Sequence, residues 1–187
     1  MFGSFNPLQS VPLTVVTPQL IVQGTLRSRL RRLTDVLNEP DARHLVLFDA
    51  TFMEVGSRRV VASSGVAQIQ LGDVLFVHAN GPTDSGGETR TPKQAVKTIL
   101  LAPPFTIEGF IHLPYESELH QALDAFADRF APVTDARYWA YGVAESPNDV
   151  DFLVFNHARA HVAVPATVEW RREPVSEPGS NGAHNPW

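Results

Sequence analysis

The densest group of side chains able to do chemistry is a run of four arginines, Arg27, Arg29, Arg31 and Arg32. Guanidinium groups bind carboxylates and phosphates through paired hydrogen bonds, so the cluster is a candidate site for a small anionic ligand or an acidic partner. Cations at the start of a helix oppose its dipole, so local helix stability does not explain them. The interpretation that the sequence favours is a solvated face whose charge is balanced by Asp35, Glu39 and Asp41, and the ligand or partner site is the alternative.

A second group consists of two arginine–aspartate pairs that recur 86 residues apart, Arg43 with Asp49 and Arg129 with Asp135. In each pair the aspartate follows the arginine by six residues and lies in an otherwise apolar segment. An arginine–carboxylate or aspartate–backbone contact would satisfy a half-buried charge there. We therefore expect these four residues to be structural anchors, and a ligand site present in both copies is the alternative.

A third group, Arg137, Trp139 and Tyr141, has the composition of a contact surface. Strict strand alternation would place these side chains on one face with Val133 and Asp135. Such a face can be an interface within the molecule, a partner site or a ligand cleft. We expect Trp139 and Tyr141 to lie at or beside a junction between two halves of the chain.

Motifs for catalysis and metal binding are weak or absent in the sequence. His157 and His161 lack a neighbouring cysteine or carboxylate, and Arg159 between them would repel a cation, so we interpret them as ordinary turn histidines. No nucleophile elbow, P-loop, zinc-protease motif or glycine-rich dinucleotide fingerprint occurs. The sequence therefore predicts a protein that is not an enzyme and that holds no metal or cofactor.

These candidate residues are positioned by a stretch that the chain contains twice. Residues 33–56 align without a gap on residues 119–142 at a constant offset of 86, and the flank 11–26 aligns on 96–111 at an offset of 85. A period this long indicates a duplicated small domain rather than a solenoid. A unit of about 75 residues is only marginally stable by itself, so we expect the two copies to share an interface.

Hydrophobic alternation predicts a similar order of elements in both copies. In the first copy, strands are expected at 13–16, 20–26, 45–55, 60–63, 66–69 and 74–78, with a helix through Leu30, Leu33 and Leu37. In the second, strands are expected at 96–101, 105–113, 131–141, 151–156 and 160–164, with a helix from Ser117 to about Arg129. Gly24 inside a strand indicates a bulge or a close backbone approach.

The pattern predicts an α+β fold made of two tandem repeats. Each repeat would be a small antiparallel sheet or a partly open β-barrel of about five strands with one helix. The predicted organisation is an irregular lead-in at 1–10, repeat 1 at 11–79, a linker at 80–93, repeat 2 at 94–168 and a disordered tail at 169–187.

Composition restricts the classes of partner and compartment. The formal net charge of −5 argues against non-specific binding to nucleic acid. The chain has no cysteine, which excludes disulfides and favours the cytoplasm. No apolar run reaches the roughly 18 residues of a membrane span, and the first residues do not resemble a signal peptide.

The first copy resembles an uncharacterised bacterial domain family of unknown function through Val22-Gln23-Gly24, RLTDVLN at 32–38 and LVLFDA at 45–50. A segment similar to 152–165 closes the unit in that family. The second copy departs from the pattern, with LHQALD where the first has LTDVLN. The resemblance implies a fold of this kind and brings no activity, cofactor or catalytic residue.

Arg27 and Arg31 followed by Asp49 and Thr51 also loosely resemble PilZ-type cyclic-dinucleotide receptors. The glycine of that motif comes late, at Gly56, and the second copy has no arginine pair. The function that the sequence favours is a non-enzymatic binding or assembly module that engages a protein partner or itself. The alternative is a regulator that responds to a small anionic ligand or nucleotide through the arginines of repeat 1.

Overall fold

The computed structural model describes residues 8–29, 32–80, 93–115, 128–143 and 146–166. The first half contains β1 (Gln9–Val16), β2 (Leu20–Ser28), α1 (Leu33–Leu37), β3 (His44–Glu54), β4 (Val60–Gln70), the 3-10 turn η1 (Leu71–Asp73) and β5 (Phe76–Ala79). The second half contains β6 (Lys93–Ala102), β7 (Phe105–Pro114), β8 (Phe130–Ala140), β9 (Asn148–Asn156), η2 (His157–Arg159) and β10 (Val162–Pro165). Most of the linker predicted at 80–93, the helix predicted from Ser117 and the tail at 169–187 lie outside the described residues.

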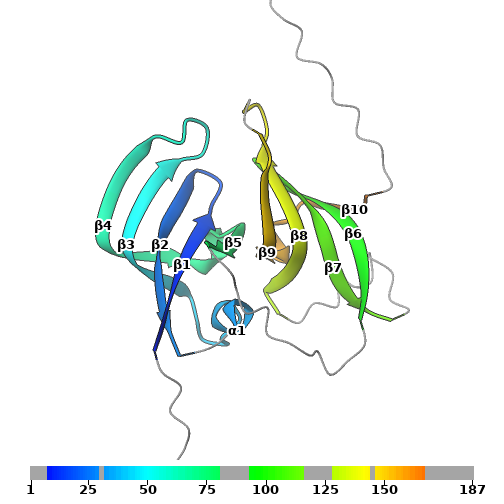
Figure 1. Ribbon diagram of the computed structural model, residues 1–187, viewed down its shortest axis with the longest axis horizontal. Coiled ribbons are helices and arrows are strands. Elements are labelled where there is room, and N and C mark those ends of the chain that lie inside the picture. Colours follow the sequence, from blue (N-terminus) through cyan, green and yellow to red (C-terminus); the bar gives the residue numbers. More distant parts are fainter. Residues whose placement is uncertain (1–7, 30–31, 81–92, 116–127, 144–145, 167–187) are drawn as a thin grey trace, which may run out of the picture.

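The described strands form one antiparallel sheet in the order β10-β6-β7-β8-β9-β5-β1-β2-β3-β4. Figure 1 shows β4 at one lateral end and β6 with β10 at the other. The predicted α+β fold and the partly open barrel in each repeat are therefore wrong. Closing a five-stranded barrel in the first half would require β5 to pair with β4, but β5 pairs with β9 instead. The α-helix of the described residues, α1, has only five residues, too few to form a layer over the sheet.

The two halves of the sheet nevertheless have the same internal order. The first half runs β5-β1-β2-β3-β4 and the second runs β10-β6-β7-β8-β9. Backbone hydrogen bonds outside the strands recur at equivalent positions. The amide of Leu71 donates to the carbonyl of Arg43 (2.9 Å), and the amide of His157 donates to the carbonyl of Arg129 (3.2 Å). The sequence repeat is thus matched by a repeat of topology.

Each half also contains a β-bulge at the equivalent place. The register shifts between β2 and β3 next to Gly24, and between β7 and β8 next to Gly109. Opposite these glycines, Asp49 and Asp135 have positive φ angles of 53° and 47°, which aspartate tolerates better than most residues. A Cβ at Gly24 would lie 3.0 Å from the carbonyl oxygen of Phe48, so the close approach expected at Gly24 is confirmed.

The bulges break the alternation that the sequence analysis assumed. Leu47 and Ala50 are buried in the same core although they are three residues apart, and so are Val133 and Ala136. The extra residue, an exposed aspartate in each case, returns the strand to the same face one position late. The single faces predicted for 47–55 and 133–141 are therefore wrong.

The halves join through β5 and β9, which place alternate residues on opposite faces of the sheet. Phe76 and Phe155 point into a cluster that we call the second-repeat core, which is built mainly from β6–β9. Val77 and Val154 point into the first-repeat core, which is built mainly from β1–β4. The sheet therefore encloses one core on each face, and each half contributes side chains to the other half's core.

Two asparagines fasten this junction. The side chain of Asn38, which follows α1, donates to the carbonyl of Phe130 and accepts from its amide, both at 2.8 Å. Asn156 is 2% exposed, and its amide group donates to the carbonyls of Val74 (3.1 Å) and Leu71 (3.4 Å). The short helix thus serves to hold Asn38 against β8.

Candidate functional site

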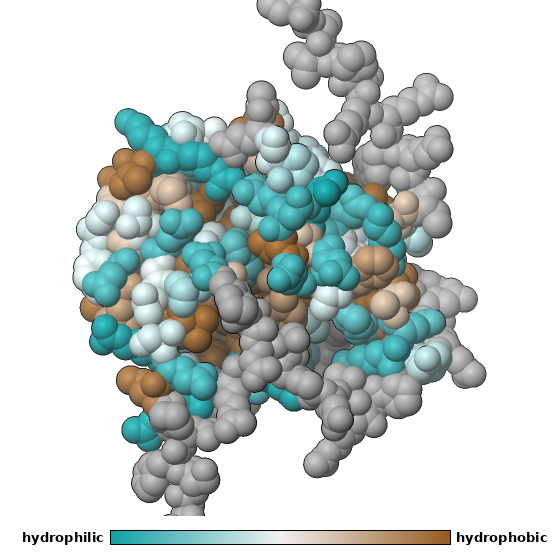
Figure 2. Space-filling model, in the orientation of Figure 1, coloured by the Kyte–Doolittle hydropathy of each residue, from teal (hydrophilic) through white to brown (hydrophobic). Residues whose placement is uncertain are grey.

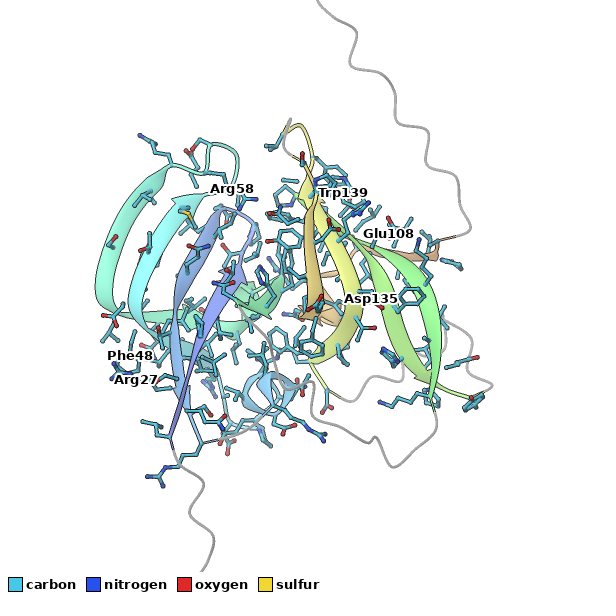
Figure 3. All side chains as sticks on the ribbon, viewed as in Figure 1. Arg27, Phe48, Arg58, Glu108, Asp135 and Trp139 are labelled. Atoms are coloured by element: carbon cyan, nitrogen blue, oxygen red, sulfur yellow. The ribbon has the colours of Figure 1, made fainter. Side chains whose placement is uncertain are left out.

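The predicted arginine cluster is spread along the end of β2 and the start of α1. Arg27, Arg29 and Arg32 are exposed, and Arg31 lies outside the described residues. The guanidinium carbon of Arg27 stands 4.1 Å from the ring centre of Phe48, a cation–π contact on the outer side of the first half (Figure 3). Arg27 remains exposed in this contact, so its guanidinium can still donate hydrogen bonds to a ligand.

The four predicted anchor residues are all exposed: Arg43, Asp49, Arg129 and Asp135. Within the described part of the chain, no ion pair joins these arginines to these aspartates. What the two copies share is backbone geometry, since the arginine carbonyls accept equivalent hydrogen bonds and the aspartates occupy equivalent bulges. The structure thus places the arginines just before β3 and β8 and the aspartates in the bulges of these strands, and all four side chains are exposed rather than half-buried in pairs.

The third group lies at the end of β8 and just beyond it. Arg137 donates from Nε to Asp149 (2.7 Å), and this hydrogen bond raises the pKa of the guanidinium. Trp139 is half-buried opposite Thr106 of β7, and Tyr141 is 48% exposed. The neighbouring Tyr138 is the side chain of this segment that contacts β5 across the repeat junction.

A buried polar pair that sequence reasoning missed lies at that junction. His78 of β5 is 7% exposed, and its Nε2 lies 3.1 Å from the hydroxyl of Tyr138. Its Nδ1 lies 3.4 Å from the carbonyl of Ala79, so the ring is best described as a neutral tautomer that donates from Nδ1 and accepts at Nε2. Burial lowers the pKa of His78 below its ordinary value. The available signal was a lone histidine inside the apolar run 74–79.

A cavity of about 350 Å³ opens beside this pair, between the end of β5 and the start of β9. Its lining is His78, Ala79, Asn80, Asp149, Val150, Asp151 and Phe152. Three of the polar side chains there are engaged by other groups: Asp149 pairs with Arg137, and the amide oxygen of Asn80 accepts from Thr14 (2.8 Å). His78 is engaged by Tyr138. The cavity is therefore a polar recess in which these three side chains are held by other protein groups.

The free edge of the sheet at β4 is the most unusual surface of the described residues. The eleven residues Val60–Gln70 read VVASSGVAQIQ and contain neither a charge nor a proline. On their open side they pair with no strand of the described sheet. Proteins usually protect such edges with lysine, proline or a covering loop, because an unpaired row of backbone groups is a template for another strand.

Exposed aliphatic side chains accompany this edge. Val60, Val61 and Val66 of β4 are 56%, 48% and 56% exposed, and Val46 of the adjacent β3 is 39% exposed. Figure 2 shows brown, hydrophobic surface among hydrophilic surface at the margin where Figure 1 places β3 and β4. We call β4 with these side chains the β4 edge. A long, uncharged, partly apolar edge can add a strand through backbone hydrogen bonds.

Comparison with protein-family models, with curated proteins and with solved structures finds no match to this chain. Among the described residues, no helix is long and apolar enough to cross a membrane, and no group of three or more potential metal-binding side chains is found. The argument for function therefore depends on the site geometry.

Proposed function

We propose that the protein is a non-enzymatic binding or assembly module that accepts an extended strand along the β4 edge. The observation that carries the proposal is the uncharged edge strand Val60–Gln70, which pairs with β3 on one side and with no strand of the described sheet on the other. An added strand would gain backbone hydrogen bonds along β4, and Val60, Val61 and Val66 would provide apolar contacts for alternate side chains.

The distribution of charge within the sheet supports this proposal. The interior strand β9, which is equivalent to β4, contains Asp149 and Asp151, whereas the edge strand β4 contains no charge. Protection against pairing would favour the opposite arrangement, with charges on the edge. A strand kept free of charge at the edge is instead suited to pair with another strand.

The chemistry of the junction cavity supports a non-enzymatic role. The imidazole of His78 and the carboxylate of Asp149 are each held by another side chain, so neither is poised as a free acid or base. The chain also lacks cysteine, which favours a reducing compartment, and we place the module in the cytoplasm.

The experiment compares three tagged chains in capture from an extract of the source cells. Wild type is compared with Val61→Lys/Val66→Lys, which adds two charges to the β4 edge, and with Leu8→Lys. Leu8 is also an exposed aliphatic residue, at 62%, and it precedes β1, which lies on the far side of β2 and β3. All three chains should have the same circular dichroism spectrum and melting temperature within a few degrees.

The expected result is that the β4 double variant loses at least about tenfold of the captured material while Leu8→Lys captures as much as wild type. Hydrogen exchange of residues 60–70 should slow in the captured complex, because new strand hydrogen bonds protect β4 amides. Equal capture by wild type and by the β4 double variant would contradict the proposal.

A second candidate function, a response to a small anionic ligand, is favoured by one observation. The Arg27 guanidinium is held over Phe48 and close in sequence to the exposed Arg29 and Arg32. A thermal-shift screen with anionic metabolites and cyclic dinucleotides tests it. A ligand of this site should raise the melting temperature of wild type and should lose that effect in Arg27→Ala. A flat screen would contradict this alternative.

A further inference from the structure

The internal junction of the sheet provides a template for the partner of the β4 edge. Counted along the chain, β5 is the fifth strand of the first half and β9 is the fourth strand of the second half. These two strands pair with each other. The strands left at the two ends of the sheet are β4 and β10, which are the fourth and the fifth strand of their own halves. The two free edges of the described sheet are therefore a fourth strand and a fifth strand, the same two kinds of strand that pair at the internal junction.

We propose that a second copy of this chain is the partner, and that its β4 pairs antiparallel with β10 of the first copy. The inference rests on the proposed function of the β4 edge and specifies its occupant. Repeating the internal geometry once more would continue the sheet from one molecule into the next.

The register of this pairing follows from the internal junction, in which Val77 pairs with Val154. Moving each residue by the repeat offset of 86 converts Val77 into Ala163 and Val154 into Gln68. The predicted central pair is therefore Ala163 of one copy with Gln68 of the other. The local geometry of β10 already matches that of β5, because its pairing with β6 repeats the register of β5 on β1.

Side chains near the free edges support this docking. Val55 is 8% exposed because the junction covers it, and its counterpart in the second half is Tyr141, which is 48% exposed. Val16 is fully buried at the junction, and its counterpart Leu101 is only half-buried. A docked copy would cover the exposed aromatic and the leucine in the way that the second half covers Val55 and Val16.

The same comparison indicates that the association is reversible. On the β4 side, the buried junction residues Val154, Asn156 and Phe130 have the counterparts Gln68, Gln70 and His44, all exposed. Permanent interfaces are more apolar than transient ones, so the polar counterparts predict a weaker contact than the internal junction. Gln70 keeps the amide group with which Asn156 bonds the neighbouring turn.

The contact is also heterologous, because it joins two different edges. A pair of molecules joined in this way still presents one free β4 and one free β10. Association of this type continues into open chains unless its rotation closes a ring. We therefore expect a ladder of species that grows with concentration rather than a single dimer.

Cysteine trapping tests the proposal without background, because the chain has no cysteine of its own. Two single variants, Gln68→Cys and Ala163→Cys, are oxidised mildly, each alone and as a mixture, at concentrations from about 1 to 200 μM. A directly opposed pair in an antiparallel ladder has a Cα separation of about 5.5 Å, which is compatible with a disulfide. The control mixture pairs Ala163→Cys with Ser63→Cys, which lies five residues away along β4, or about 16 Å.

The proposal expects that a disulfide-linked dimer forms in the mixture of Gln68→Cys with Ala163→Cys at least tenfold faster than in the control mixture. A chain that carries both Gln68→Cys and Ala163→Cys should give a ladder of linked oligomers on oxidation. Faster linking of Gln68→Cys with itself would overturn it in favour of β4 paired with β4. Absence of any cross-link, with wild type monomeric in sedimentation at 200 μM, would overturn it as well. If capture of another protein still depends on the β4 edge in that case, the proposed function stands and only the identity of the partner is wrong.

Discussion

Replacing Asn156 with alanine tests whether the junction between β5 and β9 holds the sheet together. In the folded chain its side-chain amide donates to the carbonyl of Val74 at 3.1 Å, and its side-chain oxygen accepts from the amide of Ala158 at 3.2 Å. Asn156 is 2% exposed and Val74 is fully buried, so water cannot readily replace the lost donor at this carbonyl. Two net hydrogen bonds of about 1 kcal/mol each, together with the desolvation of an unpaired carbonyl, give an expected loss of about 2–4 kcal/mol.

The assay is urea unfolding followed by circular dichroism at a few micromolar, where association is minimal. Asn156→Ala should lower the unfolding midpoint without changing the dependence of stability on urea. Gln70→Ala is the matched control, because Gln70 occupies the equivalent position of the first half and is exposed. We expect that control to remain within about 0.5 kcal/mol of wild type. If Asn156→Ala lowers the free energy of unfolding by less than about 1 kcal/mol, the conclusion that Asn156 stabilises the junction between β5 and β9 is refuted.

Two further predictions concern the bulge and the buried histidine. Gly109→Ala should lower the free energy of unfolding by about 1–3 kcal/mol in the same assay, because the new Cβ would lie 2.5 Å from Val133 Cγ1. The control is Gly65→Ala, whose new Cβ meets no atom within 4 Å and should cause no such loss. Equal effects of the two substitutions would contradict the close approach at Gly109. Burial lowers the pKa of His78 in the folded chain, so below the ordinary pKa of 6.5 the unfolded chain binds more protons than the folded chain does. The stability that neutral, buried His78 contributes is therefore fully present above pH 6.5 and is lost as the pH falls toward the lowered pKa of the folded state. The unfolding free energy of wild type should therefore fall more steeply between pH 7 and 5.5 than that of His78→Gln, and parallel pH profiles would show that His78 does not titrate with folding.

The strands themselves could be predicted from the sequence because their signals are local. The alternation around 20–26 and 105–113 marks β2 and β7, and Gly24 marks the bulge between β2 and β3. The sequence repeat at an offset of 86 residues coincides with the same strand order in the two halves of the sheet. These features depend on residues near one another in the chain, so a periodic pattern is enough to reveal them.

The pairing that makes one sheet could not be predicted from the same patterns. β5 has only four residues, and its apolar run is compatible with pairing to β4, to β9 or to neither. The choice is made by contacts between residues far apart in the chain, such as Asn156 with Val74, 82 positions away, and Tyr138 with His78, 60 positions away. Periodicity reports which face of a strand is buried, but it does not report which strand lies beside it.

Two further predictions were wrong for local reasons: the faces assigned to β3 and β8 assumed an unbroken alternation, and the first helix was expected to be longer than it is. Asp49 and Asp135 have positive φ angles, a local conformation that hydrophobic periodicity does not encode, so the faces assigned to β3 and β8 were shifted beyond each aspartate. The leucine spacing from Leu30 to Leu37 indicated a longer helix than the five residues of α1. The helix ends at Leu37, and the next residue, Asn38, bonds the backbone of Phe130.

A duplicated unit that joins its fifth strand to the fourth strand of the next unit always leaves one edge of each kind free. Repeat proteins usually cap such ends with polar or charged surfaces, which prevents further growth. Here the two ends differ, because β10 is a four-residue strand that ends in Pro165, whereas β4 has eleven residues and carries neither proline nor charge. In the proposed contact between two copies, β10 can therefore form only a few backbone pairs, and part of the longer β4 lies outside the contact. Such a contact between a short strand, β10, and part of a long strand, β4, has few backbone hydrogen bonds, so it can form and dissociate, as a reversible assembly requires.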